Sequence, residues 1–156
     1  MSASLRDVAR KSDRAVAQAR AELVRAVRQA ARNGMTQAQI GAEIGRSQPE
    51  VSRLLRFHGT TPLGRTLRSH APEIRRLVAE CGGADVRVFG SLATGLDHSS
   101  SDIDLLFTMR EPLSLLQLGA LEAKIASLVE AHVDLVPESA LRPEFRERVL
   151  TEAVPL

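Results

Sequence analysis

A chain of 156 residues can form one ordinary domain or two small ones, and 44% hydrophobic with 26% charged residues indicates a folded chain rather than a disordered one. A single cysteine excludes an internal disulfide and a cysteine-rich zinc site, and the absence of Trp and Tyr argues against aromatic platforms for single-stranded nucleic acid. Residues 1–80 carry 15 Lys and Arg against 7 Asp and Glu, whereas residues 81–156 carry 6 against 12, so the first half suits a polyanion and the second suits cations.

No signal-peptide core is visible at the start of the sequence, and no run of apolar residues is long enough to cross a bilayer. We therefore expect a cytoplasmic protein without a membrane partner.

The first segment, residues 4–32, is rich in Ala and Arg and contains neither Gly nor Pro. Val16, Leu23 or Val24, and Val27 recur at helical spacing, which predicts one long amphipathic helix or two shorter ones. Asn33-Gly34 is a typical helix end. The long helix expected at residues 4–32 is a candidate interface for a homodimer.

Two capping boxes follow, Thr36 with Gln39 and Ser47 with Glu50, and they predict two short helices separated by a turn at Gly45. This arrangement resembles the helix-turn-helix of phage repressors and resolvases, over residues 36–56. We expect residues 1–58 to form an all-α domain that binds double-stranded DNA. The side chains expected to face the DNA are those of Arg46, Ser47, Gln48, Ser52, Arg53 and Arg56.

The pattern changes after a linker at residues 59–70, and residues 71–156 are expected to form a second domain. Leu115, Leu118, Leu121, Ile125 and Leu128 predict the buried stripe of its longest helix. In chain order, the expected elements are a helix at 71–80, a strand at 86–89, a loop at 90–101, a strand at 102–107, a helix at 112–131, a strand at 132–136 and a helix at 143–152.

Asp102 and Asp104 are two residues apart in a predicted strand, so their side chains point to the same face. Adjacent carboxylates repel one another unless a cation lies between them, and Mg²⁺ prefers carboxylates shared with phosphate oxygens. Asp134 repeats this setting on the next strand. If the two strands are neighbours, three carboxylates meet and can hold two metal ions.

Gly90 and Ser91 directly follow the strand before this pair, and a glycine there allows the backbone to approach a phosphate. Gly-Ser, ten residues and Asp-x-Asp together resemble the signature of the DNA polymerase β-like nucleotidyltransferases. Residues 86–107 and the later Val-Asp-Leu-Val are similar to the minimal subgroup, and the resemblance covers roughly residues 62–156.

The resemblance implies an α+β protein in which a small α/β nucleotidyltransferase domain with a short mixed sheet follows the helical domain. It implies that Gly90 and Ser91 hold the triphosphate of ATP, and that Asp102, Asp104 and Asp134 hold two Mg²⁺ ions. Asp134 would also help to deprotonate the acceptor hydroxyl. The acceptor oxygen would attack the α-phosphorus, and pyrophosphate would leave.

Minimal nucleotidyltransferases of this size resemble the antitoxin partners of HEPN-type RNase toxins, some of which they silence by transferring AMP to a tyrosine. An added DNA-binding domain suits autoregulation of such an operon. Two alternatives stay open at this point. One is a transcription regulator whose nucleotidyltransferase domain only senses nucleotide, and the other is a small-molecule enzyme of the aminoglycoside type.

Overall fold

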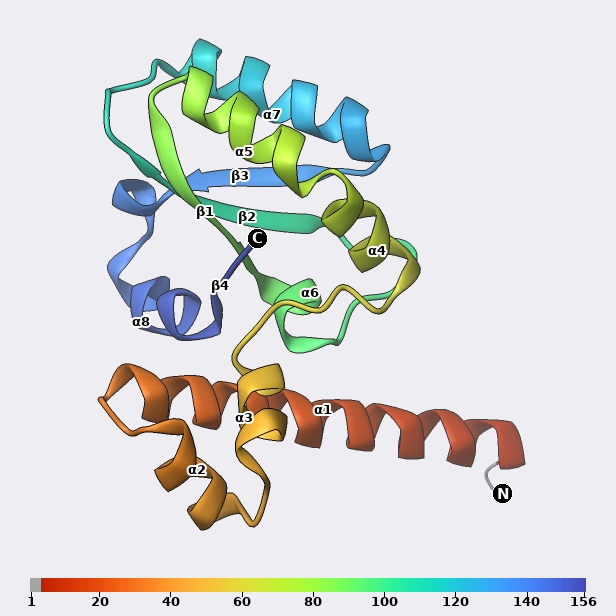
Figure 1. The fold of residues 1–156 in the computed structure, drawn as a ribbon. Helices are drawn as coiled ribbons and strands as arrows, with labels where there is room; N and C mark the ends of the chain where they lie inside the picture. Colours follow the sequence, from red (N-terminus) through yellow and green to blue (C-terminus); the bar gives the residue numbers. More distant parts are fainter. Residues whose placement is uncertain (1–3) are drawn as a thin grey trace.

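Four strands form one mixed sheet in the C-terminal part of the chain (Figure 1). The computed structural model describes residues 4–156, so residues 1–3 of the expected helical domain lie outside the described part. The expected α+β class with a short mixed sheet is confirmed, although the sequence did not predict the last and shortest strand. The strands are β1 (Gly83–Phe89), β2 (Ile103–Met109), β3 (Val133–Pro137) and β4 (Val154–Pro155), in the order β3-β2-β1-β4.

The pairing directions decide where the strand ends lie. β1 is antiparallel to both of its neighbours, β2 and β4, whereas β2 and β3 are parallel. A parallel pair needs a crossover connection, and α7 (Leu115–Val129) supplies it. As a result, the N-terminal ends of β2 and β3 lie side by side at the same edge of the sheet.

One face of the sheet is covered by α5 (Ala71–Glu80) and α7, which lie above it in Figure 1. The core between these layers is aliphatic apart from Phe107. Ile74, Leu105, Phe107 and Ile125 are all fully buried there. Two further helices, α6 (Gly90–Thr94) and α8 (Pro143–Glu152), lie on the other side of the sheet.

The segment expected as a linker, residues 59–70, contains a helix that packs against the sheet domain. This helix, α4 (Pro62–Ser69), begins after Thr61, whose side chain accepts a hydrogen bond from the Gly64 N–H. Leu67 is fully buried in the same core as the sheet. The part of the expected linker without regular structure is therefore the short stretch before Thr61.

The helical region consists of α1 (Leu5–Arg32), α2 (Gln37–Ile44) and α3 (Gln48–Leu54). Both predicted capping boxes are formed, and Gly45 ends α2 in the left-handed conformation with φ of 68°. The three helices enclose a small core of their own, made of Val24, Val27, Ile40, Val51 and Leu54.

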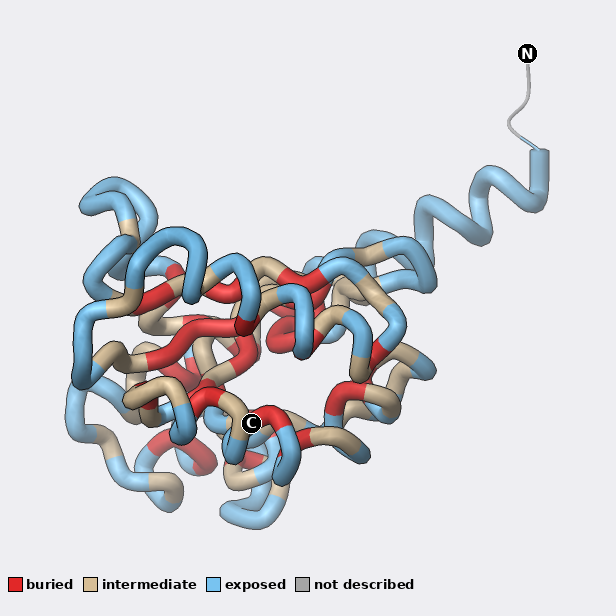
Figure 2. The backbone as a smooth tube through the Cα atoms, turned by 90° about the horizontal axis from the view of Figure 1, so that it is seen from above, coloured by how far each residue is buried: buried red, intermediate tan, exposed pale blue. Residues whose placement is uncertain are grey.

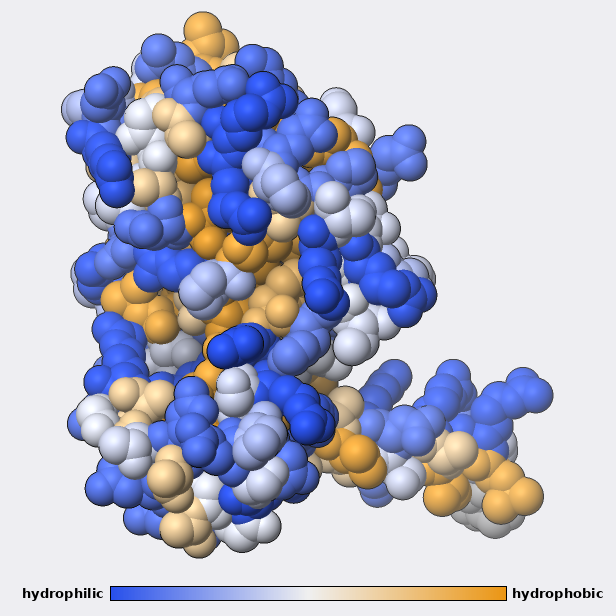
Figure 3. All heavy atoms as spheres, in the orientation of Figure 1, coloured by the Kyte–Doolittle hydropathy of each residue, from blue (hydrophilic) through white to orange (hydrophobic). Residues whose placement is uncertain are grey.

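The first half of α1 extends away from the rest of the molecule (Figure 2). Val16, expected in a buried stripe, is 67% exposed, and Leu5 and Val8 are exposed with it. Figure 3 shows hydrophobic side chains along this free part of the helix. Leu115 corrects the prediction in the same way, because it is 88% exposed at the start of α7. In both places, the apolar spacing continues beyond the surface on which the helix packs.

A buried arginine joins the helical region to the sheet domain. Arg28 of α1 donates hydrogen bonds to three backbone carbonyls: Leu54 O at 3.1 Å, Ala93 O at 2.9 Å and Glu152 O at 2.7 Å. These carbonyls belong to the last turns of α3, α6 and α8. Burial lowers the pKa of Arg28 to about 10, and the charge of Glu152 partly opposes this effect. The contact therefore holds four helices at one point.

Candidate active site

Three carboxylates meet where β2 and β3 begin. Asp104 and Asp134 are direct partners in the parallel register of these two strands, and Asp102 lies immediately before β2. Ile103 and Leu105 alternate with the carboxylates and are fully buried. The strand alternation expected from the sequence therefore brings these three acidic residues together.

The environment of Asp104 resists ionisation. Burial, followed by the charges of Asp134 and Asp102, raises the pKa of Asp104 from 3.8 to about 6. Such a cluster of oxygen donors concentrates negative charge, and it fits divalent cations with a preference for oxygen ligands. The donor set therefore agrees with the metal-binding role implied by the sequence.

His132 belongs to the same cluster, although the sequence did not single it out. Its Nδ1 lies 3.3 Å from Asp102 Oδ1 and 4.0 Å from Asp134 Oδ1. One ligand atom from each of these three residues fits within a group 4.8 Å across. The signal was the spacing, because His132 precedes Asp134 by two residues and therefore points to the same face of an extended chain.

Gly90 lies where β1 passes into α6, directly against Asp104. Its φ of 70° is in the left-handed region, and a Cβ at this position would overlap the Asp104 carboxylate. Residues 90–101 were expected to form a loop, which is wrong for residues 90–94, because they form α6. The short helix places Ser91 in its first turn and ends at Gly95. A residue larger than glycine at this position would therefore collide with the carboxylate cluster, independently of any role of Gly90 in phosphate binding.

The six residues expected to face DNA differ in their surroundings. Arg46, Ser47 and Gln48 are exposed at the end of α3 that lies away from the sheet domain. Arg53 and Arg56 instead line a pocket between α1 and α6. Ser52 is only partly exposed. The exposed residues before and at the start of α3 and the pocket-lining pair therefore lie at opposite ends of this helix.

In the described part of the chain, residues 4–156, no helix is long and apolar enough to span a membrane.

Comparison with known proteins identifies relatives of the second half of the chain. The family model for the nucleotidyltransferase domain matches residues 67–156. Protein adenylyltransferase MntA of Thermococcus cleftensis is 35% identical over 88 residues, which cover 56% of this chain and 86% of that protein. The family match begins within α4 and does not include residues 1–66.

Two solved structures extend the comparison. One, described as "putative minimal nucleotidyltransferase", is 39% identical, covers 64% of this chain and all of the other, and has a TM-score of 0.55. The second is a toxin–antitoxin crystal structure with AMP-PNP, with 25% identity, coverage of 55% of this chain and 70% of the other, and a TM-score of 0.50. Both likenesses extend over little more than the length of the sheet domain.

Proposed function

The chain belongs to the nucleotidyltransferase domain family, and from this premise we propose that it is a protein adenylyltransferase that serves as the antitoxin of a toxin–antitoxin pair. The observation that carries the proposal is the meeting of Asp102, Asp104 and Asp134 at the adjacent ends of β2 and β3, with Gly90 packed against Asp104. The names of the MntA relative and of the toxin–antitoxin structure support the choice of acceptor.

The proposed roles of the residues follow from their positions. Asp102, Asp104 and Asp134 would hold two Mg²⁺ ions, which when bound supply charge neutralisation for the triphosphate and the acceptor oxygen. Gly90 and Ser91 would hold the triphosphate through the backbone and the hydroxyl. Asp134 would accept the proton of the acceptor hydroxyl. His132 lies beside Asp102 and would orient that carboxylate.

The proposed transfer balances as a substitution at phosphorus. The acceptor oxygen forms a bond to the α-phosphorus of ATP, the bond from the α-phosphorus to the bridging oxygen breaks, and pyrophosphate leaves. We place the acceptor hydroxyl on a tyrosine of an HEPN-type RNase toxin. This chain has no tyrosine, so a tyrosine acceptor must come from a partner.

The test is incubation with α-labelled ATP, Mg²⁺ and the product of the neighbouring toxin gene. We expect label on the toxin and loss of its RNase activity, and we expect neither with Asp104→Asn. Asp85→Asn is the matched control, because Asp85 is exposed, remote from the cluster and already has a positive φ that Asn tolerates. A toxin that stays unlabelled by the wild-type chain would reject the proposal. Labelled aminoglycoside would favour the small-molecule alternative.

DNA binding by residues 1–58 is a second proposed function, and one observation favours it. Arg46, Ser47 and Gln48, just before and at the start of α3, are exposed, and helix-turn-helix proteins contact base edges with that end of the second helix. Close packing at the turn supports the motif, because a Cβ on Gly41 would overlap the Arg46 carbonyl at 2.5 Å. Ser52 and Arg53 lie further along α3 and Arg56 lies just beyond its end, and all three stay part of this proposal although Arg53 and Arg56 also line the pocket.

Gel-shift titration against the promoter of the operon tests this second function. We expect Gln48→Ala to relax sequence preference and Arg46→Gln to lower the salt dependence of binding. Equal DNA binding by the wild type, Gln48→Ala and Arg46→Gln would reject this second function.

The exposed apolar stripe of α1 is the proposed homodimer contact, and light scattering of the free and DNA-bound protein tests it. If Asp104→Asn represses normally and the wild type transfers no AMP, the nucleotide-sensing regulator becomes the better description.

A further inference from the structure

A pocket of about 390 Å³ lies between the helical region and the sheet domain. Its walls come from α1, the end of α3, residues 57–61, α4 and the last turn of α6. Five arginines line it, Arg20, Arg28, Arg53, Arg56 and Arg68, and they approach from three separate segments of the chain. The active-site carboxylates are not part of its lining.

Most of the arginines of this pocket have no salt-bridge partner among residues 4–156. Arg28 is occupied by its three carbonyls, and Arg68 donates one hydrogen bond, to His58 O at 3.0 Å. Within residues 4–156, no salt bridge involves Arg20, Arg53, Arg56 or Arg68. The one acidic residue of the lining, Asp97, accepts a hydrogen bond from Thr61 at 2.6 Å.

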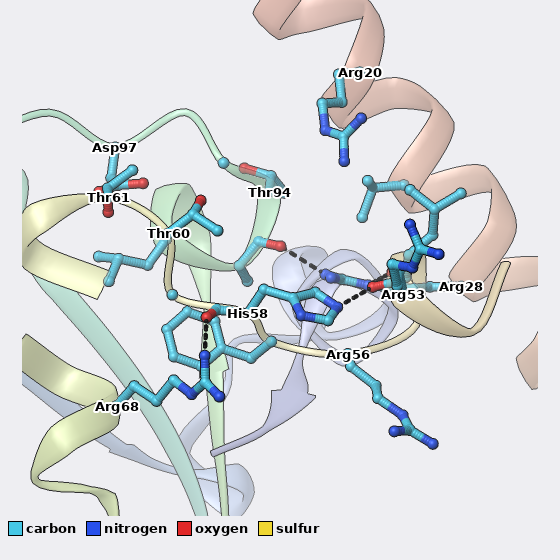
Figure 4. A pocket seen from close by; sticks show the side chains of 17 residues that line it. Arg20, Arg28, Arg53, Arg56, His58, Thr60, Thr61, Arg68, Thr94 and Asp97 are labelled. Carbon is cyan, nitrogen blue, oxygen red and sulfur yellow. Dashed lines mark hydrogen bonds between the residues drawn. The ribbon is translucent and has the colours of Figure 1, made fainter. Parts of the chain in front are cut away.

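Figure 4 shows how these groups are arranged. Arg20 extends from α1 toward the pocket, Arg53 lies beside Arg28, and Arg68 lies on the opposite side beyond His58. Arg56 turns outward at the rim. Arg20, Arg53 and Arg68 therefore approach the pocket from different sides, whereas Arg56 does not point into it.

The chemistry of this space fits a phosphorylated ligand. Like charges held close together repel, and an anion between them converts this repulsion into attraction. Guanidinium groups bind phosphate oxygens in bidentate geometry, so several of them suit a chain of phosphates. The volume lies in the range of small-ligand sites, and Leu54, Phe57 and Leu92 add an apolar portion to the wall.

We propose that this pocket is a regulatory site for a free nucleoside polyphosphate, separate from the proposed substrate site. A recess between two parts of the protein favours a small ligand over a DNA duplex, whose convex backbone meets protruding surfaces. The pocket is coupled to the substrate site through α6. Gly90 and Ser91 begin this helix, and Leu92 to Gly95 at its other end line the pocket. Binding at the pocket does not depend on whether AMP transfer occurs.

The test separates the two sites with EDTA. Without a divalent cation the carboxylate site repels a triphosphate, whereas arginines need no metal. We therefore titrate the full-length chain with ATP, with GTP and with inorganic triphosphate in EDTA, and follow binding by calorimetry. We expect saturable binding near one ligand per chain, and we expect it to persist in Asp104→Asn, which abolishes the proposed transfer.

The decisive variant is Arg20→Gln with Arg68→Gln, which we expect to weaken binding by about tenfold or more for each guanidinium removed. Arg14→Gln, on the exposed part of the same helix, is the charge-matched control and should bind as the wild type does. Arg20→Gln alone gives a second readout if the double variant unfolds. The proposal is overturned if the wild type shows no saturable binding of any of the three ligands, or if both pocket variants bind with unchanged affinity. It is equally overturned if Arg14→Gln weakens ligand binding as much as the pocket variants do. It is also overturned if only duplex DNA binds in a manner that requires Arg20 and Arg68.

Discussion

Replacing Asp104 with Asn should stabilise the metal-free protein while removing its activity. In the folded chain, the pKa of Asp104 is raised from 3.8 to about 6, by burial first and then by Asp134 and Asp102. Between these two pH values the folded state binds more protons than the unfolded state. The free energy of unfolding therefore falls as pH rises through this window, and the penalty is complete above pH 6.

The size of the effect follows from the shift. At about 1.4 kcal/mol per pH unit, the shift sets an upper bound of roughly 3 kcal/mol. Asp104 is only half-buried, so solvent screening reduces this bound, and we expect a gain of about 1 kcal/mol for Asp104→Asn at pH 7.5. For a chain of this length, such a gain corresponds to a rise of roughly 2–4 °C in Tm.

Thermal and urea unfolding in EDTA measures this gain, at pH 7.5 and again near pH 4. The gain should be much smaller at the lower pH, where Asp104 is protonated in the folded state and nearly half protonated in the unfolded state. Mg²⁺ should then stabilise the wild type and not Asp104→Asn, because only a ligand of the folded state raises its stability. Asp85→Asn is the control and should leave the stability unchanged at both pH values. An Asp104→Asn variant that is no more stable than wild type at pH 7.5 would refute the electrostatic reasoning.

Three further changes test other parts of the structure. Gly90→Ala should lower the rate of AMP transfer by roughly a hundredfold, because the new Cβ displaces the Asp104 carboxylate. Gly119→Ala, where nothing lies within 4 Å of the new Cβ, should instead raise the free energy of unfolding by about 0.5–1 kcal/mol. Initial rates test the first change and urea midpoints test the second. Arg28→Gln should lower the free energy of unfolding by about 2–4 kcal/mol, because three buried carbonyls lose their donor. Residues 55–61 should then become accessible to trypsin, whereas Arg32→Gln, at an exposed position, should leave them protected. Similar digestion of the two variants would contradict this prediction. His132→Ala should weaken the midpoint of Mg²⁺-dependent stabilisation by about tenfold, as expected for an orienting neighbour of a ligand, and an unchanged midpoint would exclude that role.

Local chemistry made much of the fold predictable from the sequence. Thr36 and Ser47 each start a helix through a side chain whose partner is three residues away, so these helices are encoded within a few positions. Alternation of side chains along a strand predicts that Asp102 and Asp104 face the same way. These signals need no knowledge of distant segments, whereas the meeting with Asp134 depends on the pairing of β2 with β3.

The features that were missed depend on distant contacts or on very short elements. β4 has two residues and α6 has five, which is too short for any periodicity to be visible. An arginine near the end of an amphipathic helix would be expected to lie in solvent, yet the partners of Arg28 are up to 124 positions away. Val16 and Leu115 have the spacing of buried residues, but no neighbouring element reaches them.

The separation between Arg28 and its last partner also bears on the order in which the chain is made. A ribosome releases the N-terminal helices long before it completes α8, so Glu152 O is among the last groups to become available. Until then, Arg28 can reach Leu54 O and Ala93 O but lacks its third partner. Chains interrupted before α8 would therefore hold their helical region less tightly. The residues that line the arginine pocket all precede α8, so the pocket can be assembled before the junction that secures it is complete.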